Sequence, residues 1–148
     1  MFDDLEKIER EGLTLASLQA RGWAFFIDEV IVSLIFFIIF WDFIFVLKTP
    51  EKMIEAINSL VGYLLLLKII YQTFFVWYYA ATPGKMILKI EVIEERDFQT
   101  PSFLVSLNRA IGRVISEMLF YLGFAWAFLD PKRQTWHDKL AKTLVVNV

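Results

Sequence analysis

The sequence predicts an all-α membrane protein with two transmembrane helices, a third bent or re-entrant helical region, and a short cytoplasmic strand pair. Hydrophobic residues make up 57% of its 148 residues and aromatic residues 17%, whereas soluble domains contain about 45–50% apolar residues. In water, a core of this size would have too few polar residues to cover it. Two apolar stretches are also long enough to cross a bilayer. The chain length fits one domain.

The composition excludes several classes of function. The net charge of −2 gives no basic field for nucleic acid. The absence of cysteine excludes disulfides and thiolate metal sites. His137 is the only histidine, so we expect no metal site and place it beside a helix N-terminus at the interface. No GxSxG, P-loop or HExxH motif occurs, so we expect neither an enzyme nor a cofactor.

Residues 1–20 form a polar arm that precedes the membrane domain, residues 21–148. Leu5, Ile8, Leu13 and Leu15 are loosely spaced on one helical face. This spacing predicts a cytoplasmic helix that is solvated or lies at the membrane surface. The acidic start of the arm lacks the basic-then-apolar layout of a cleaved signal peptide. We therefore expect the first retained hydrophobic segment to drive insertion.

The first predicted span runs over residues 23–47. Trp23 and Trp41 lie near its ends, roughly 27 Å apart along a helix. Tryptophan prefers the two membrane interfaces, which fits this separation.

The second predicted span begins at Ile54 or Ile57 and ends at Tyr79. It follows a short polar link that contains Pro50 as a helix breaker. Beyond it, Pro83 and Gly84 predict a turn.

Two short segments rich in β-branched residues follow different turns. They are Ile87–Ile93 and Leu144–Val148, which we predict to be strands that pair with each other. The pair must lie outside the hydrocarbon, because lipid does not tolerate open sheet edges.

The third apolar region, Ser102–Leu129, allows two paths. Its first half places Arg109, Arg113 and Glu117 at helical spacing, as an i, i+4, i+8 ladder. Its second half has only about a dozen apolar residues, too few to span alone. One long tilted crossing fits the pattern, and so does a bent or re-entrant pair of helices, which we favour.

Charge placement supports the re-entrant path and sets the orientation. Lys48 and Lys52 are the only basic residues in the link between the two spans. The positive-inside rule then places both termini and the middle loop in the cytoplasm. Both ends of the third region would share that side, as the strand pairing also requires.

Charged residues inside the apolar segments are the candidate binding groups. Asp28, Glu29 and Lys68 lie within the two spans, where each charge costs about 2.5–3.5 kcal/mol unless it is paired or faces a cavity. Arg21 is two helical turns from Asp28, so both share one helix face. The long stem of Lys68 can extend toward Asp28 or Glu29. The alternative is that these charges are buried pairs that only fix helix register.

Four segments of the chain resemble the RDD family of bacterial membrane proteins. They are LASLQARGWAFFIDEVIV, YYAATPGKMILKIEVI, LNRAIGRVISEML and DPKRQTWHDKLAKTLVV. The name-giving arginine and two aspartates of the family match Arg21, Asp28 and Asp138. The resemblance implies a multi-pass protein of the bacterial inner membrane. It also implies transport, with cation/proton exchange attributed to some members.

Two functions therefore compete. The first is transport of ions or small solutes, with Asp28 binding a monovalent cation or a proton and Arg21 tuning its pKa. Asp138 would form a gate with Arg109 or Arg113, and a homodimer would enclose the pathway. The second is a membrane adaptor that docks a cytoplasmic partner, in which the charges only hold the fold.

Overall fold

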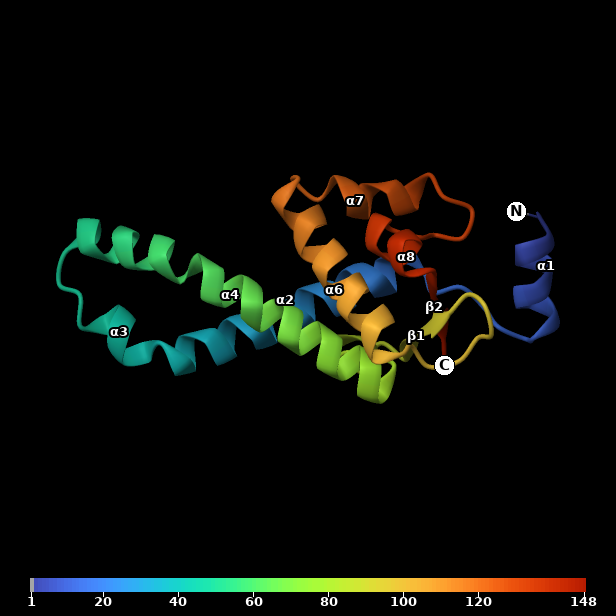
Figure 1. Cartoon of the computed structure of the whole chain (residues 1–148), viewed down its shortest axis with the longest axis horizontal. Helices are drawn as coiled ribbons and strands as arrows, with labels where there is room; N and C mark the ends of the chain where they lie inside the picture. The colour runs from blue at the N-terminus through green and yellow to red at the C-terminus, as the bar shows by residue number, and fades with distance from the viewer. Residues whose placement is uncertain (1) are drawn as a thin grey trace.

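A computed structural model describes residues 2–148, and its architecture is a long helical hairpin joined to a compact end (Figure 1). Helix α6 packs against α4, and α8 packs against α6. The arm, the two strands and both chain ends lie together at the compact end (Figure 1). The elements in chain order are α1 (Phe2–Arg10), α2 (Leu18–Ile39), α3 (Trp41–Phe45), α4 (Pro50–Tyr79), α5 (Pro83–Ile87), β1 (Ile90–Glu94), α6 (Phe103–Met118), α7 (Leu122–Ala125), the 3₁₀ helix η1 (Trp126–Phe128), α8 (Trp136–Ala141) and β2 (Thr143–Asn147).

Helices α2 and α4 form the hairpin, and both are long and apolar enough to cross a membrane. Ser17 caps α2 by accepting a hydrogen bond from the amide of Ala20, so this helix begins before the predicted start at Trp23. It ends at Ile39, with Phe40 as its C-cap, and α3 continues the apolar segment. Pro50 begins α4 rather than breaking it, because the first helical position needs no N–H donor.

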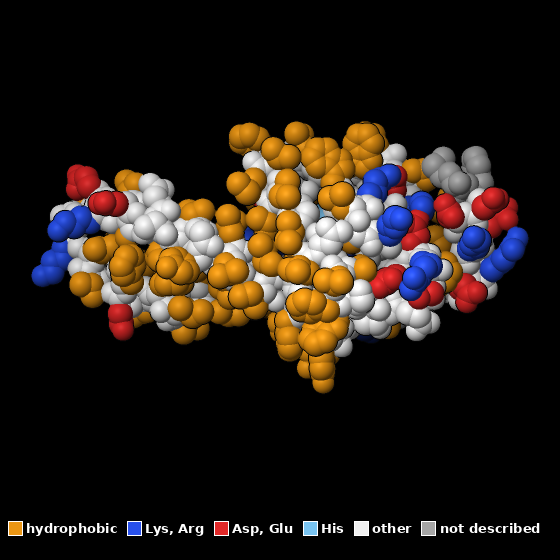
Figure 2. Space-filling view, in the orientation of Figure 1, with side chains coloured by type: hydrophobic (Ala, Val, Ile, Leu, Met, Phe, Trp, Pro, Cys, Tyr) orange, Lys and Arg blue, Asp and Glu red, His pale blue; other side chains and the backbone are white. Residues whose placement is uncertain are grey.

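The surface of the hairpin is strongly apolar between two charged ends. Hydrophobic side chains cover its length, whereas acidic and basic side chains gather at its tip and at the compact end (Figure 2). Leu34, Ile38 and Leu66 are among the large hydrophobic residues that the fold leaves exposed. A surface of this kind is stable in lipid, where exposed apolar groups carry no cost.

The third apolar region bends sharply, as one of the two predicted paths requires. Helix α6 and the segment α7–η1 meet at 107°. At the bend, Phe120 and Tyr121 have φ angles of 57° and 62°, which no continuous helix allows. Gly123 lies so close to Ser116 that a Cβ would be 2.2 Å from its Oγ, and this closeness lets α7 fold back. A re-entrant path through the bilayer stays a prediction.

The predicted strand pair is present. Strands β1 and β2 are antiparallel, with Ile90 opposite Asn147 and Glu94 opposite Thr143. The first strand begins at Ile90 instead of Ile87, because the Pro-Gly turn continues into the short helix α5. The position of the strand pair outside the hydrocarbon stays a prediction.

The N-terminal arm packs against this strand pair. Leu15 forms an isolated bridge with Val146, and the amide of Ala16 donates to the carbonyl of Val145 at 2.9 Å. Ile8 is buried against Leu144 and its neighbours on the strands. The predicted apolar face of the arm therefore contacts protein, and the arm is helical at residues 2–10 and again from Leu18, where α2 begins.

Candidate functional site

The eight residues predicted for the site belong to three charged groups at the crossing of α2, α4, α6 and α8. Asp28 forms the first group with neutral donors. Arg21, Arg109 and Asp138 form the second. The third, named here the quartet, contains Glu29, Lys68, Arg113 and Glu117.

Asp28 is fully buried and joins three elements. Its carboxylate accepts hydrogen bonds from the hydroxyl of Tyr71 at 2.9 Å, the hydroxyl of Thr82 at 2.5 Å and the amide of Gly84 at 2.8 Å. A Cβ on Gly84 would lie 2.2 Å from the carbonyl oxygen of Ala24, so only glycine allows this approach. Asp28 therefore holds α4 and the start of α5 against α2.

Arg21 pairs with Asp138 rather than with Asp28. Its guanidinium donates to Asp138 at 2.5 Å and also to the backbone carbonyl of Arg133. Arg109 donates to the other oxygen of Asp138 at 2.7 Å. A capping box with Thr135 places Asp138 at the start of α8. The predicted contact between Asp138 and Arg109 is thus present, while its role as a gate stays a prediction.

The protonation of Asp138 follows from this pairing. Burial by itself would raise the pKa of the carboxyl, but Arg21 and Arg109 outweigh it and hold the pKa of Asp138 well below its ordinary value. Asp138 is therefore ionised, and it offsets part of the positive charge around it.

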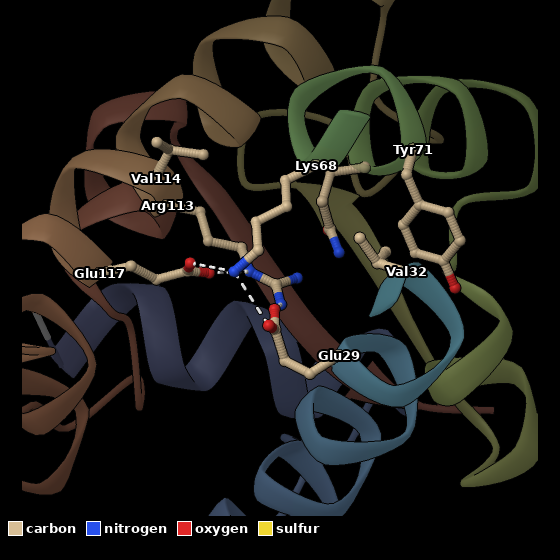
Figure 3. Close-up of a pocket in the computed structure, with 8 residues that line it drawn as sticks. Glu29, Val32, Lys68, Tyr71, Arg113, Val114 and Glu117 are labelled. Carbon is tan, nitrogen blue, oxygen red and sulfur yellow. Dashed lines mark hydrogen bonds and ion pairs between the residues drawn. The ribbon is translucent and has the colours of Figure 1, made fainter. Parts of the chain in front are cut away.

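The quartet joins α2, α4 and α6 (Figure 3). The ammonium of Lys68 contacts Glu29 at 2.9 Å and Glu117 at 2.6 Å. Arg113 contacts the same two carboxylates at 3.3 and 3.4 Å. Lys68 was predicted to extend toward Asp28 or Glu29, and of these two it contacts Glu29. The predicted ladder step from Arg113 to Glu117 is also present. The enclosed space beside the quartet is about 10 Å³, close to the minimum for one water molecule.

A larger cavity of about 230 Å³ lies between α2, α6 and the segment from Tyr121 to His137, and we name it the basic cavity. Its polar lining is almost entirely basic. The polar residues that line it are Arg21, Lys85, Arg109, Arg113, Thr135 and His137. The other lining residues are Leu18, Gly22, Phe25, Tyr121, Phe124, Ala127 and Phe128. Arg113 lines this cavity and also belongs to the quartet.

Lys85 is the lining residue that the sequence reasoning missed. It is only 7% exposed, and within residues 2–148 its ammonium has no hydrogen bond or ion pair. Burial, and then the positive charges of Arg109 and Arg113, lower the pKa of Lys85 well below its ordinary value. The sequence signal that could have identified Lys85 is its position directly after Thr82-Pro83-Gly84, in a segment that resembles the family.

His137 is the second residue lining the basic cavity that has a polar atom without a hydrogen-bond partner. Its side chain is buried, its ring packs against Phe124 at a centroid distance of 5.1 Å, and its Nδ1 has no partner in the described part of the chain. Burial lowers the pKa of His137 well below its ordinary value, so the ring is neutral. The residue lies at the start of α8 as expected, with its side chain buried in the protein. Its position at the membrane interface stays a prediction. Residues 2–148 contain no group of three His, Asp or Glu side chains placed to hold a metal ion.

Several curated proteins are similar to part of the chain. The Proline-rich antigen homolog of Mycobacterium tuberculosis (strain CDC 1551 / Oshkosh) is 34% identical over 65 residues, which are 44% of this chain and 27% of that protein. The Proline-rich antigen of Mycobacterium leprae (strain TN) is 31% identical over 65 residues, 44% of this chain and 26% of that protein. An uncharacterized protein of Rickettsia prowazekii (strain Madrid E) is 28% identical over 71 residues, 47% of this chain and 39% of that protein. These matches span well under half the length of the relatives.

A family model gives broader coverage than these relatives. No solved structure matches the chain. The model of the RDD family matches residues 15–142, a range that contains Arg21, Asp28 and Asp138, the residues on which the resemblance rests. Since this range covers most of the chain, the protein belongs to the RDD family.

Proposed function

We propose that this membrane protein transports a small solute and that the basic cavity binds the solute as an anion. The observation that supports the proposal is the lining. Arg21, Lys85, Arg109 and Arg113 all line one cavity. In the described residues Lys85 forms no ion pair, and Asp28 attracts it only at longer range. Buried cations without counter-ions are costly in a medium of low dielectric constant. An anionic solute would supply the missing charge.

The same geometry is unfavourable for a cation in this cavity. A cation would meet four positive side chains and no exposed carboxylate. Asp28 already accepts three hydrogen bonds and does not line the cavity. Asp138 is held by two arginines. We therefore assign Asp28 and Asp138 positioning roles within the proposal, rather than the ion-exchanging role that the sequence favoured.

The quartet is coupled to the cavity in this proposal. Arg113 contacts both carboxylates of the quartet and also lines the basic cavity. An anion that attracts the Arg113 guanidinium weakens its contacts with Glu29 and Glu117, which Lys68 continues to hold. Anion binding and the packing of α2 against α6 would thus be linked through one side chain.

The orientation and the oligomeric state are part of the proposal. The compact end, which carries both chain ends, would face the cytoplasm of a bacterial inner membrane, since the link at the hairpin tip holds only Lys48 and Lys52. Two spanning helices and one bent pair cannot enclose a pathway. We therefore place transport in a twofold homodimer, which cross-linking in native membranes would detect as a band of twice the monomer mass.

The test uses the full chain reconstituted in vesicles of neutral phosphatidylcholine. Uptake is measured for three labelled probes, which are inorganic phosphate, octyl phosphate and rubidium. We expect uptake of at least one phosphate probe above empty vesicles. Lys85→Met should abolish it, because the substitution keeps the side-chain length and removes the charge. Lys89→Met is the matched control, since Lys89 lies on the surface nearby.

The opposite pattern would overturn the proposal. Rubidium uptake that survives Lys85→Met and disappears in Asp28→Asn would support cation/proton exchange at Asp28. Absence of protein-dependent uptake for all three probes would favour the adaptor function, in which the charged groups only hold the fold.

A further inference from the structure

The basic cavity is also lined by aromatic rings, and these rings identify the kind of anion. Phe25, Phe124 and Phe128 line it together with the basic side chains. The Arg113 guanidinium lies over the Phe25 ring, 4.8 Å from its centroid, and His137 packs against Phe124. A small hydrated anion such as free phosphate would lose water against these rings and gain nothing from them. A molecule with an anionic group and an apolar chain suits both kinds of lining at once.

We propose that the basic cavity binds the phosphate group of an anionic membrane lipid, with the lipid chains leaving between α2 and the α7–η1 segment. This inference rests on the proposed anion site and names its ligand class. The lipid source is favoured because the cavity wall is also the outer surface. Tyr121 and Phe128 line the cavity, and the same side chains are 48% and 75% exposed.

The surface around this wall is apolar. Phe120 is 91% exposed and Leu129 is 79% exposed, and hydrophobic side chains gather over the α7 region (Figure 2). Exposed residues of this type are stable only against lipid or another apolar surface. A lipid beside α7–η1 would thus reach the cavity without its chains entering water.

The size of the cavity fits a headgroup rather than a whole lipid. Its volume of about 230 Å³ is many times the roughly 10–15 Å³ that one water molecule needs. This space accepts a phosphate group and the first atoms attached to it. Two acyl chains do not fit inside, so they must lie outside against Tyr121 and Phe128.

The polar lining offers the donors that a phosphate requires. No hydrogen bond or ion pair of the Lys85 ammonium occurs within residues 2–148, and His137 has an unpartnered Nδ1 although its side chain is only 3% exposed. With Lys85 protonated, five cationic side chains and four carboxylates lie around the cavity and the quartet. The resulting excess of one positive charge matches the single negative charge of a phosphodiester lipid, and a bound anion would oppose the effect of burial by favouring the protonated form of Lys85.

The test measures lipid binding by native mass spectrometry of the full chain released from detergent. The protein is titrated separately with phosphatidylglycerol, zwitterionic phosphatidylcholine and inorganic phosphate. We expect phosphatidylglycerol to bind at least tenfold more tightly than phosphatidylcholine, with no competition from millimolar inorganic phosphate. Lys85→Met should weaken phosphatidylglycerol binding by about tenfold to a hundredfold, the effect of losing a hydrogen bond to a charged group. Lys89→Met should leave it unchanged.

A second pair of variants tests the lipid entrance without touching the buried charges. Phe128→Glu places a negative charge at the mouth of the cavity and should weaken phosphatidylglycerol binding several-fold. Leu129→Glu adds the same charge on the neighbouring residue, which is equally exposed but does not line the cavity. It should have little effect. Both positions are on the surface, so folding is preserved.

The outcomes separate this inference from the function on which it rests. If inorganic phosphate binds as tightly as phosphatidylglycerol, with the same dependence on Lys85, the anion site stands and the lipid assignment is wrong. If phosphatidylcholine binds as tightly as phosphatidylglycerol, the net charge of the headgroup does not matter and the assignment to an anionic lipid is wrong. If no anion binds in a manner that depends on Lys85, the anion site itself is wrong.

Discussion

Arg21 and Asp138, which are 117 positions apart in the sequence, form an ion pair at 2.5 Å. This contact joins the start of α2 to the start of α8, and Asp138 is completely buried within it. Arg109 on α6 holds the second carboxylate oxygen. One carboxylate thus fixes the positions of three helices, and the basic cavity lies among them.

Replacing this carboxylate should destabilise the whole compact end. In Asp138→Asn two buried arginines lose their counter-ion, and we expect the free energy of unfolding to fall by about 3–5 kcal/mol. Thermal unfolding in detergent micelles, followed by circular dichroism, measures this loss. Asp97→Asn is the control, because Asp97 forms an exposed pair with Arg96 that contributes little. Equal melting temperatures for the two variants would contradict the prediction.

Gly84 should be intolerant of any side chain. Gly84→Ala forces a Cβ to within 2.2 Å of the carbonyl oxygen of Ala24, so α5 must move away from Asp28. We expect a loss of about 1–3 kcal/mol in unfolding free energy. Gly62→Ala in α4 has no neighbour within 4 Å of the new Cβ and should stabilise the helix by about 0.5–1 kcal/mol. Denaturant titration of both variants compares them, and a Gly84→Ala protein as stable as Gly62→Ala would refute the packing argument.

His137 should make the protein less stable in mild acid. The pKa of the buried ring lies well below 6.5, so below pH 6.5 the unfolded chain binds a proton that the folded chain does not. Stability is therefore complete above pH 6.5 and falls as the pH decreases, by about 1.4 kcal/mol per unit until the folded pKa is reached. The neighbouring Asp138, which faces the ring, stays ionised across this window.

The matching variant is His137→Phe, which keeps the ring packing against Phe124. Its unfolding free energy should be almost constant between pH 6.5 and pH 5, where that of the wild type declines. Denaturant midpoints at four pH values within this range provide the measurement. Parallel pH profiles for the two proteins would show that His137 titrates normally in the folded state.

Removing one cation from the quartet should lower the free energy of unfolding more than removing one cation together with one carboxylate. Lys68→Met leaves Glu29 and Glu117 with Arg113 alone. We expect a loss of about 3 kcal/mol, at the lower end for a buried ion pair because Glu29 is 26% exposed. The double variant Lys68→Met/Glu117→Gln keeps the pair of Arg113 and Glu29 and should recover most of this loss. Thermal unfolding of the single and double variants tests the coupling, and a double variant no more stable than the single one would exclude it.

Some features of the charged site were predictable from sequence, and others were not. The depth argument placed Lys68 at the level of Asp28 or Glu29, because two antiparallel neighbouring spans leave few partners at one depth, and the structure pairs it with Glu29. The helix-face argument failed for Arg21, which shares a face with Asp28 but pairs with Asp138. Lys85 was not considered, because its segment was predicted as a turn and not as part of a buried helix. The partner of a charge depends on which helices meet, and local spacing does not contain this information.

The sequence by itself determined that this is an RDD-type membrane chain with two apolar helices long enough to cross a bilayer and a pair of short strands. These features are local, because the bilayer thickness sets the length of an apolar span and β-branched runs favour strands. Tertiary structure decided the rest. It bent the third region by 107°, engaged the two family aspartates in hydrogen bonds and ion pairs, and gathered four basic side chains around one cavity. Only folding brings residues distant in sequence close enough for their charges to interact.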